Sequence, residues 1–245
     1  MSLSYKESIS RDVLAHLQDP EFCDVRIVGT DGEIGANKTI LGMRSLYFRS
    51  MFSANNNFVE SQVGSVKLPY AKAVLEKVII YLYSGEMEFD DLDLRPLLDL
   101  MELLNLLNLT PEFSTVESFA MENIRGAKFT FADCLKSLDY SSKLGLKSVG
   151  ETLLFYLGEN FVNIAQMKEV GDLSEPMILK LLDEKSGVRS ETIHRLNVLT
   201  TWLSGNTMAT QVRCIFFLIK CFCWKICNIK GGFWEKLHAT IFRGR

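Results

Sequence analysis

The sequence predicts an α+β domain, in which helices cover a small sheet, followed by an all-α domain. Two observations lead to this prediction. Near the N-terminus, Val25 and Ile27 alternate with charged residues, the period-2 pattern of a half-buried strand, and an Asp-Gly pair at 31–32 is typical of a tight hairpin turn. From Phe129 onward the strand patterns disappear, and apolar residues recur at helical spacing.

The first predicted element is a short amphipathic helix over residues 4–17. Its apolar stripe consists of Ile9, Val13, Leu14 and Leu17. A helix that precedes the first strand has few local partners to cover such a stripe. One cover that the sequence leaves open is the rest of the same chain, with the helix acting as a lid.

Helices and one further strand follow the hairpin. Apolar residues within 41–52 are spaced for two short helices, and residues 66–69 form a brief strand that its terminal proline stops. Residues 71–83 predict a helix, and Gly85 suits the left-handed position that ends it. The residues of this helix expected to face inward are Val74, Val78, Ile79 and Leu82.

Helical patterns then continue to the end of the predicted body. A strongly apolar helix covers 92–107, and Thr110 is expected to cap the next one, with Pro111 as its first residue. Ser190 is a plausible cap for the last helix. The all-α part has its helical patterns at 131–144, 148–160, 175–182 and 191–203. We place the domains at 1–125 and 126–205, with a divergent tail at 206–245.

Composition is that of an ordinary globular protein: 245 residues, 47% apolar and 23% charged, with a net charge of −3. The charge is uneven, because the tail from 206 carries seven Lys or Arg against Glu235 alone. The residues before it hold 20 basic and 29 acidic side chains. This acidic body gives no general attraction to nucleic acid, so we expect no direct nucleic acid binding. The six cysteines follow no disulfide framework, and the polar N-terminus favours an intracellular protein of the cytoplasm or nucleus.

The order of landmarks between Phe22 and Gly85 resembles the BTB/POZ domain, a protein-interaction fold. The segments are FCDVRIV, the turn, EIGANKTIL, RSLYFRSMF, FVES, VKLP and VLEKVIIYLYSGE. Further landmarks, ENFVNI, VGDLSEPMILKLL, VRSETI and the segment around Trp202, resemble the all-helical BACK domain that commonly follows BTB in adaptor proteins. The BACK-like part is short, and Asn37 stands where the family usually has histidine. The resemblance implies a homodimer, with Ile9, Val13, Leu14 and Leu17 at the interface.

Phe58 and Glu60 are the sharpest candidates for binding a partner. They lie in a polar stretch, where an aromatic residue has little reason to be buried by its neighbours. BTB adaptors that bind cullin-3 carry a hydrophobic-x-Glu motif at this place, so the resemblance implies an apolar plug with a charged contact to the cullin N-terminal domain. The alternative is that Phe58 folds back onto the domain core.

Asp24 and Lys38 are candidates for a charged pocket that some family members use to hold peptides. A buried charge is costly unless it is paired. We favour a structural role for both residues, in which Asp24 accepts hydrogen bonds from backbone donors and Lys38 stands at a helix start.

No catalytic, metal or cofactor site is expected. The three histidines are scattered, and the sequence has neither a Gly-rich phosphate loop nor a Gly-x-Ser-x-Gly elbow. An acidic cluster at 86–93 lacks the spacing of a calcium loop, so helix capping and a solvated face explain it better.

The tail segment 212–229 is aromatic and rich in cysteine, and Lys220 and Lys225 interrupt it. It is short for a membrane span, and its cysteine spacing is not that of a zinc site. We favour a helix that packs on the BACK-like part, or a divergent end outside any ordered fold, over membrane contact through an interfacial anchor.

These observations favour a non-enzymatic adaptor of a cullin-3 RING ubiquitin ligase, which would bring an unidentified substrate protein into the ubiquitination pathway. The alternative is a BTB scaffold or transcriptional regulator without ligase activity.

Overall fold

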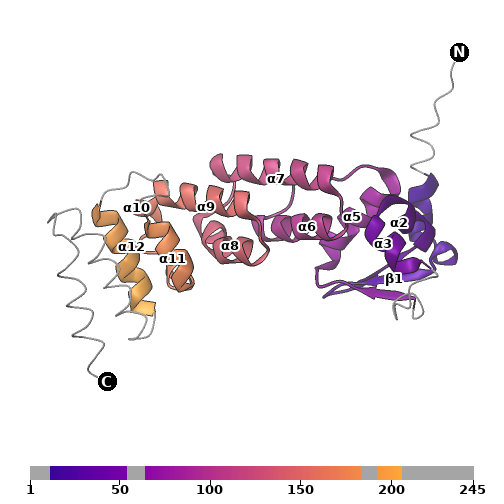
Figure 1. Cartoon of the computed structure of the whole chain (residues 1–245), viewed down its shortest axis with the longest axis horizontal. Coiled ribbons are helices and arrows are strands. Elements are labelled where there is room, and N and C mark those ends of the chain that lie inside the picture. Colours follow the sequence, from indigo (N-terminus) through magenta and orange to yellow (C-terminus); the bar gives the residue numbers. More distant parts are fainter. Residues whose placement is uncertain (1–11, 54–63, 184–191, 206–245) are drawn as a thin grey trace, which may run out of the picture. The chain divides into compact units, whose positions relative to one another are not determined.

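The computed structural model describes residues 12–53, 64–183 and 192–205. The chain forms two compact units, which divide between Thr152 and Leu153. The first unit contains a small sheet with helices around it, and the elements described in the second unit are all helical (Figure 1). This arrangement confirms the predicted fold class. The predicted domain boundary after residue 125 stays a prediction.

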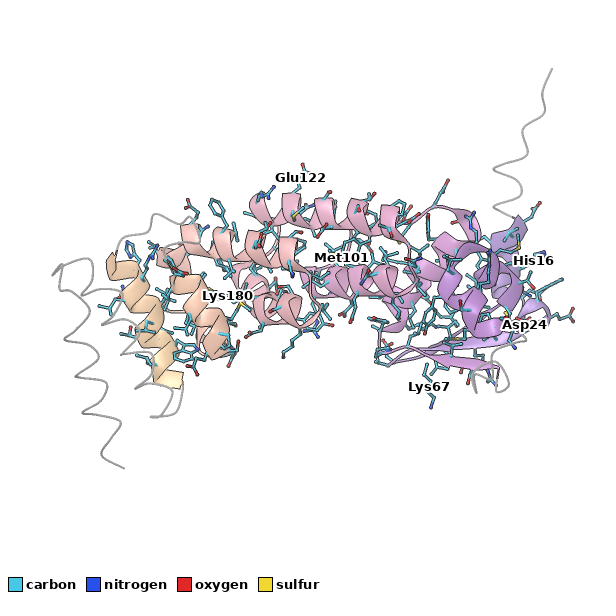
Figure 2. All side chains as sticks on the ribbon, in the orientation of Figure 1. His16, Asp24, Lys67, Met101, Glu122 and Lys180 are labelled. Atoms are coloured by element: carbon cyan, nitrogen blue, oxygen red, sulfur yellow. The ribbon has the colours of Figure 1, made fainter. Side chains whose placement is uncertain are left out.

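Three short strands form the sheet of the first unit: β1 (Val25–Val28), β2 (Glu33–Ala36) and β3 (Ser65–Lys67), in the order β2-β1-β3. β1 pairs with β2 antiparallel and with β3 parallel. Ile27 lies opposite Ile34 on one side and Val66 on the other, and all three side chains are buried. The alternation seen in the sequence therefore places one apolar row in the core, while Lys67 points to solvent (Figure 2).

Helices supply most of the first unit. Two 3-10 turns, η1 (His16–Gln18) and η2 (Pro20–Phe22), precede the sheet. The α-helices that follow are α2 (Lys38–Arg44), α3 (Leu46–Phe52), α5 (Lys72–Ser84), α6 (Leu94–Leu106), α7 (Thr110–Arg125), α8 (Phe131–Lys143) and α9 (Lys147–Glu159), the last of which continues into the second unit.

The core of the first unit centres on α5 and α6. The four side chains predicted to face inward from α5 are all buried, which confirms that prediction. α6 contacts α5, α7 and α8, and this explains why seven of its residues are buried. Met101, a residue of α6, is one of these buried side chains (Figure 2). Burying side chains on several sides of one helix is typical of a central core element.

Two predictions about helix ends had different outcomes. Gly85 ends α5 with φ 84°, and its N–H donates to the Tyr81 carbonyl at 2.8 Å, so the left-handed cap is confirmed. Thr110 was expected to cap α7, and this was wrong. The cap position is Leu109, whose carbonyl accepts the first helical hydrogen bond from Phe113, and Thr110 is already helical. Ser190, the expected cap of the last helix, lies outside the described residues.

The second unit contains α10 (Phe161–Ile164), η3 (Lys168–Val170), α11 (Glu175–Leu182) and α12 (Thr192–Gly205). Trp202 anchors α12, because its buried indole N–H donates to the Leu173 carbonyl at 2.7 Å. The hydroxyl of Thr201 donates to the Ala165 carbonyl. At the end of α12, a Cβ on Gly205 would lie 3.5 Å from the Cα of Gly171. The C-terminal turn of α12 is therefore held against the 165–173 segment.

Candidate interaction surfaces

The first candidate surface is the N-terminal face, which we define by Val13, Leu14, Leu17 and Phe22. Residues 12–15 are helical and lead into η1. Val13, Leu14 and Leu17 are half-buried, so the single chain covers the predicted stripe only in part. Ile9, the fourth residue of the predicted dimer stripe, lies outside the described residues.

Phe22 is a member of this face that the sequence did not single out. Its side chain is 48% exposed, and its ring centroid lies 4.2 Å from that of His16. Asp19 supports this turn, because its carboxylate accepts from the Glu21 N–H at 3.0 Å. The available signal was strand phase: Val25 and Ile27 face inward, so Phe22, an odd number of residues before them, falls on the outward-facing phase.

Asn37 fixes the N-terminal face to the rest of the domain. Its side-chain oxygen accepts from the N–H groups of Thr39 and Ile40 at 2.9 and 3.3 Å, which makes it the cap of α2. Its amide nitrogen donates to the Phe22 carbonyl at 3.1 Å. Its backbone N–H donates to the Tyr83 hydroxyl at 2.7 Å, and burial raises the pKa of that phenol. One residue thus joins the Phe22 turn, α2 and α5.

Asp24 and Lys38 are brought together through the backbone. The exposed carboxylate of Asp24 accepts from the Lys38 N–H at 2.7 Å, at the first residue of α2. The Lys38 ammonium lies 5.8 Å from the centroid of the Phe52 ring. Figure 2 shows Asp24 and His16 at the same end of the first unit. These contacts agree with the structural role that we favoured, and a peptide-holding pocket stays a prediction.

The second candidate surface is the α2–α3 corner, which we define by Met43, Leu46 and Arg49. Met43 is 69% exposed and Leu46 is 56% exposed. The guanidinium of Arg49 donates to the carbonyls of Gly42 and Met43 at 2.9 and 3.3 Å, so it ties α3 to the end of α2. The corner therefore presents two apolar side chains on a backbone that is held in place.

The inner side of the corner is anchored in the domain core. The buried hydroxyl of Ser45 donates to the Leu107 carbonyl at 3.1 Å. The guanidinium of Arg44 donates to the Leu82 carbonyl at 3.2 Å. Phe58 and Glu60, the predicted cullin-binding residues, lie outside the described residues. They belong to the segment 54–63, which follows α3 directly along the chain.

Two lysines contact the acidic cluster at 86–93, one at a carboxylate and one at a backbone carbonyl. The Lys77 ammonium donates to the Asp91 carboxylate at 2.8 Å, and this hydrogen bond holds the pKa of that carboxyl below its usual range. The Lys128 ammonium donates to the Asp90 carbonyl at 2.5 Å. Asp93 occupies the cap position of α6 without a side-chain capping bond. The lysine contacts agree with a solvated face.

Groups suited to metal binding or nucleophilic chemistry do not converge in the described ranges. Within residues 12–53, 64–183 and 192–205, no three His, Cys, Asp or Glu side chains form a potential metal site. Burial raises the pKa of the Cys134 thiol to about 12, and it also raises the pKa of Cys23, so both thiols are poor nucleophiles at neutral pH. Among the helices that the structure describes, none has the length and apolar character to cross a bilayer.

Comparison with known proteins gives a family match to the first unit. The model of the BTB/POZ domain matches residues 14–116. The "Leucine-zipper-like transcriptional regulator 1 homolog" of Drosophila melanogaster is 25% identical over 77% of this chain and 19% of its own length. "Kelch-like protein 5" of Homo sapiens is 26% identical over 82% of this chain and 26% of its own. "Kelch repeat and BTB domain-containing protein 1" of Vaccinia virus (strain Copenhagen) is 25% identical over 90% of this chain and 37% of its own length.

The chain thus spans between about a fifth and two fifths of the length of these relatives. Among solved structures, the BTB domain of human Gigaxonin aligns with a TM-score of 0.39 and 23% identity, covering 49% of this chain and 96% of that one. The described helices of the second unit suggest the BACK-like part. The sequence match establishes that this chain carries a BTB/POZ domain at residues 14–116.

Proposed function

We propose that the chain acts, inside the cell, as a non-enzymatic and homodimeric substrate adaptor of a cullin-3 RING ubiquitin ligase. The observation that carries the proposal is the α2–α3 corner, where a BTB/POZ domain exposes Met43 and Leu46 on an anchored backbone. Exposed apolar side chains on a rigid frame are the usual centre of a binding site. In this role the chain performs no chemistry and raises the effective concentration of ubiquitin carrier near a substrate.

The corner supports the predicted cullin motif by its place in the chain. α3 ends at Phe52, and the segment that contains Phe58 and Glu60 begins two residues later. A cullin helix that covers Met43 and Leu46 would therefore have the Phe58 plug and the Glu60 carboxylate close by in sequence. Kelch-like relatives of similar sequence add support for an adaptor of this type.

Homodimerisation is proposed through the N-terminal face. Val13, Leu14 and Leu17 are only half-buried in one chain, and Phe22, which follows Leu17 by five residues, is exposed. A second copy that covered this face would complete the burial of an apolar stripe. Light scattering of the full chain should give twice the chain mass at micromolar concentration, and a clean monomer would exclude the dimer.

The cullin proposal is tested by titration calorimetry of the full chain against the cullin-3 N-terminal domain. The pair Met43→Asp and Leu46→Asp should weaken binding at least about 30-fold, because a central apolar contact is typically worth about 2 kcal/mol or more. Phe58→Ala and Glu60→Ala should act in the same direction. Ile80→Asp is a matched control, since Ile80 is 38% exposed on α5 and belongs to neither candidate surface. Equal binding by the corner variants and the control would refute this use of the corner.

The second candidate is a BTB scaffold or transcriptional regulator without ligase activity. The observation in its favour is the name of the fly relative, which is a transcriptional regulator homolog. A wild-type chain that dimerises but shows no heat of binding to the cullin would favour this candidate. The substrate or recruited partner would then be sought by affinity purification with mass spectrometry.

A further inference from the structure

Among the described residues of the second unit, three large apolar side chains are exposed. They are Phe155 on α9, Val162 on α10 and Leu196 on α12, which are 48%, 65% and 41% exposed. α10 and α12 contact each other, and the Arg195 guanidinium lies 5.9 Å from the centroid of the Phe161 ring. Val162 directly follows Phe161 in the sequence, and Leu196 directly follows Arg195. We name Phe155, Val162 and Leu196 the outer apolar face.

Acidic side chains accompany the aromatic member of this face. Glu159 lies one helical turn after Phe155 on α9, and Glu151 lies one turn before it, and both are exposed. Residues four apart on a helix are neighbours on its surface, so the Phe155 ring stands between two carboxylates. Such a surface is suited to an apolar partner that carries positive charge.

We propose that residues 212–229 of the same chain cover the outer apolar face. Of these 18 residues, 14 are apolar, and the three charged ones, Arg213, Lys220 and Lys225, are all positive. The segment therefore supplies both the apolar area and the charge that the face calls for. An apolar run of this length left in water would be an aggregation hazard, and a face on its own chain removes it.

The end of α12 brings this segment within reach. The Thr201 hydroxyl donates to the Ala165 carbonyl, directly after α10, and Gly205 packs on Gly171. The chain thus leaves α12 close to the end of α10. The six residues 206–211 can span up to about 20 Å. Thr201 lies only four residues before Gly205, and its partner Ala165 lies three residues after Val162, so Val162 is within this reach and docking within one chain is sterically feasible.

Disulfide trapping tests the contact directly. The tail carries Cys214, Cys221, Cys223 and Cys227. A full-length Val162→Cys variant should, on mild oxidation, form a disulfide between position 162 and a tail cysteine within one chain, detectable by peptide mapping. Ile80→Cys, on α5 of the first unit, is the control and should form none. A disulfide needs Cβ atoms about 4 Å apart, so trapping reports real proximity. Absence of the bond, or a bond between two copies only, would overturn the proposal.

Trypsin cleavage after Lys220 and Lys225 gives an independent measure. The double variant Phe155→Asp with Val162→Asp should speed these cleavages at least about tenfold over wild type, which corresponds to about 1.4 kcal/mol of docking energy. Ile80→Asp should leave them unchanged. Circular dichroism confirms that the variants keep the helical fold. Equal cleavage rates in all three chains, or protection that disappears on dilution, would contradict docking within one chain.

Discussion

Asn37 is the residue at which local stability and the proposed dimer surface can be separated by substitution. Its side-chain oxygen caps α2 through two N–H groups, while its amide nitrogen holds the Phe22 carbonyl. Asn37→Ala removes both functions. Asn37→Ser keeps a capping oxygen and removes only the amide donor, so it is the matched variant.

The magnitude follows from these contacts. Loss of a cap costs about 1 kcal/mol, and loss of one hydrogen bond to a carbonyl costs about 0.5–1.5 kcal/mol, with the lower value fitting this exposed pair. We therefore expect Asn37→Ala to lower the free energy of unfolding by about 1.5–2 kcal/mol. Asn37→Ser should lower it by about 0.5–1 kcal/mol, because the cap survives. Both variants should weaken dimerisation, since both release the Phe22 turn.

The assay is hydrogen exchange combined with urea unfolding of the full chain. In Asn37→Ala, the amides of Thr39 and Ile40 should exchange faster, because they lose their acceptor. In Asn37→Ser they should stay protected. Tryptophan fluorescence reports the second unit and serves as the internal control, because all three tryptophans of the chain (202, 224 and 234) belong to that unit. If the two variants showed identical exchange at both amides, the helix cap and the hydrogen bond to Phe22 could not be separated by substitution at Asn37, and the reasoning would be refuted.

Two further predictions concern a helix end and the alkaline limit of stability. Gly85→Ala should lower the free energy of unfolding by about 1 kcal/mol, because φ is 84° and the added Cβ would lie 3.3 Å from the Arg44 guanidinium. Gly42→Ala, within α2, should be neutral or stabilising. Urea unfolding ranks the two variants, and the reverse order would contradict this reasoning. Burial and then the hydrogen bond to Asp99 raise the pKa of Tyr140 to about 12, so the stability it contributes is complete below about pH 10 and is lost as pH rises through 12. Tyr140→Phe should flatten that loss in a series of Tm measurements between pH 9 and 12, and an unchanged slope would count against it.

The elements that the sequence predicted well are those whose pattern reports burial on one side. Val25 and Ile27 alternate with charged residues, and both are buried in β1. Gly85 was predictable because a left-handed cap strongly favours glycine. The Thr110 cap was wrong, because residue type alone does not fix where a helix begins. There the backbone of Leu109 accepts the first helical hydrogen bond, one residue earlier.

The exposed residues of the candidate surfaces were harder to predict. Met43 and Leu46 lie in a stretch, residues 40–48, whose many apolar residues are typical of a core. Only their helical phase distinguishes them from the buried apolar residues of the same stretch. Each lies two residues, or about 200°, from a buried neighbour, Leu41 or Phe48 respectively. The helical phase of these residues can be predicted only when the break between α2 and α3 at Ser45 is known. The tether from Asn37 to Phe22 spans 15 residues, and nothing in the sequence pattern indicates it.

Both proposed surfaces of the BTB/POZ domain depend on one short helix. α2 has seven residues and is about 10 Å long, with Asn37 at its start and Met43 near its end. The start is tied to the Phe22 turn, and the end is tied to α3 through Arg49. A change at Met43 alters only what the corner presents, whereas loss of the Asn37 side chain frays the helix that carries Met43 and also releases the Phe22 turn of the N-terminal face. Asn37→Ala is therefore expected to weaken dimerisation and cullin binding together, while Met43→Asp should leave the dimer intact. If both variants affected the two activities in equal proportion, the surfaces would have to be one continuous interface.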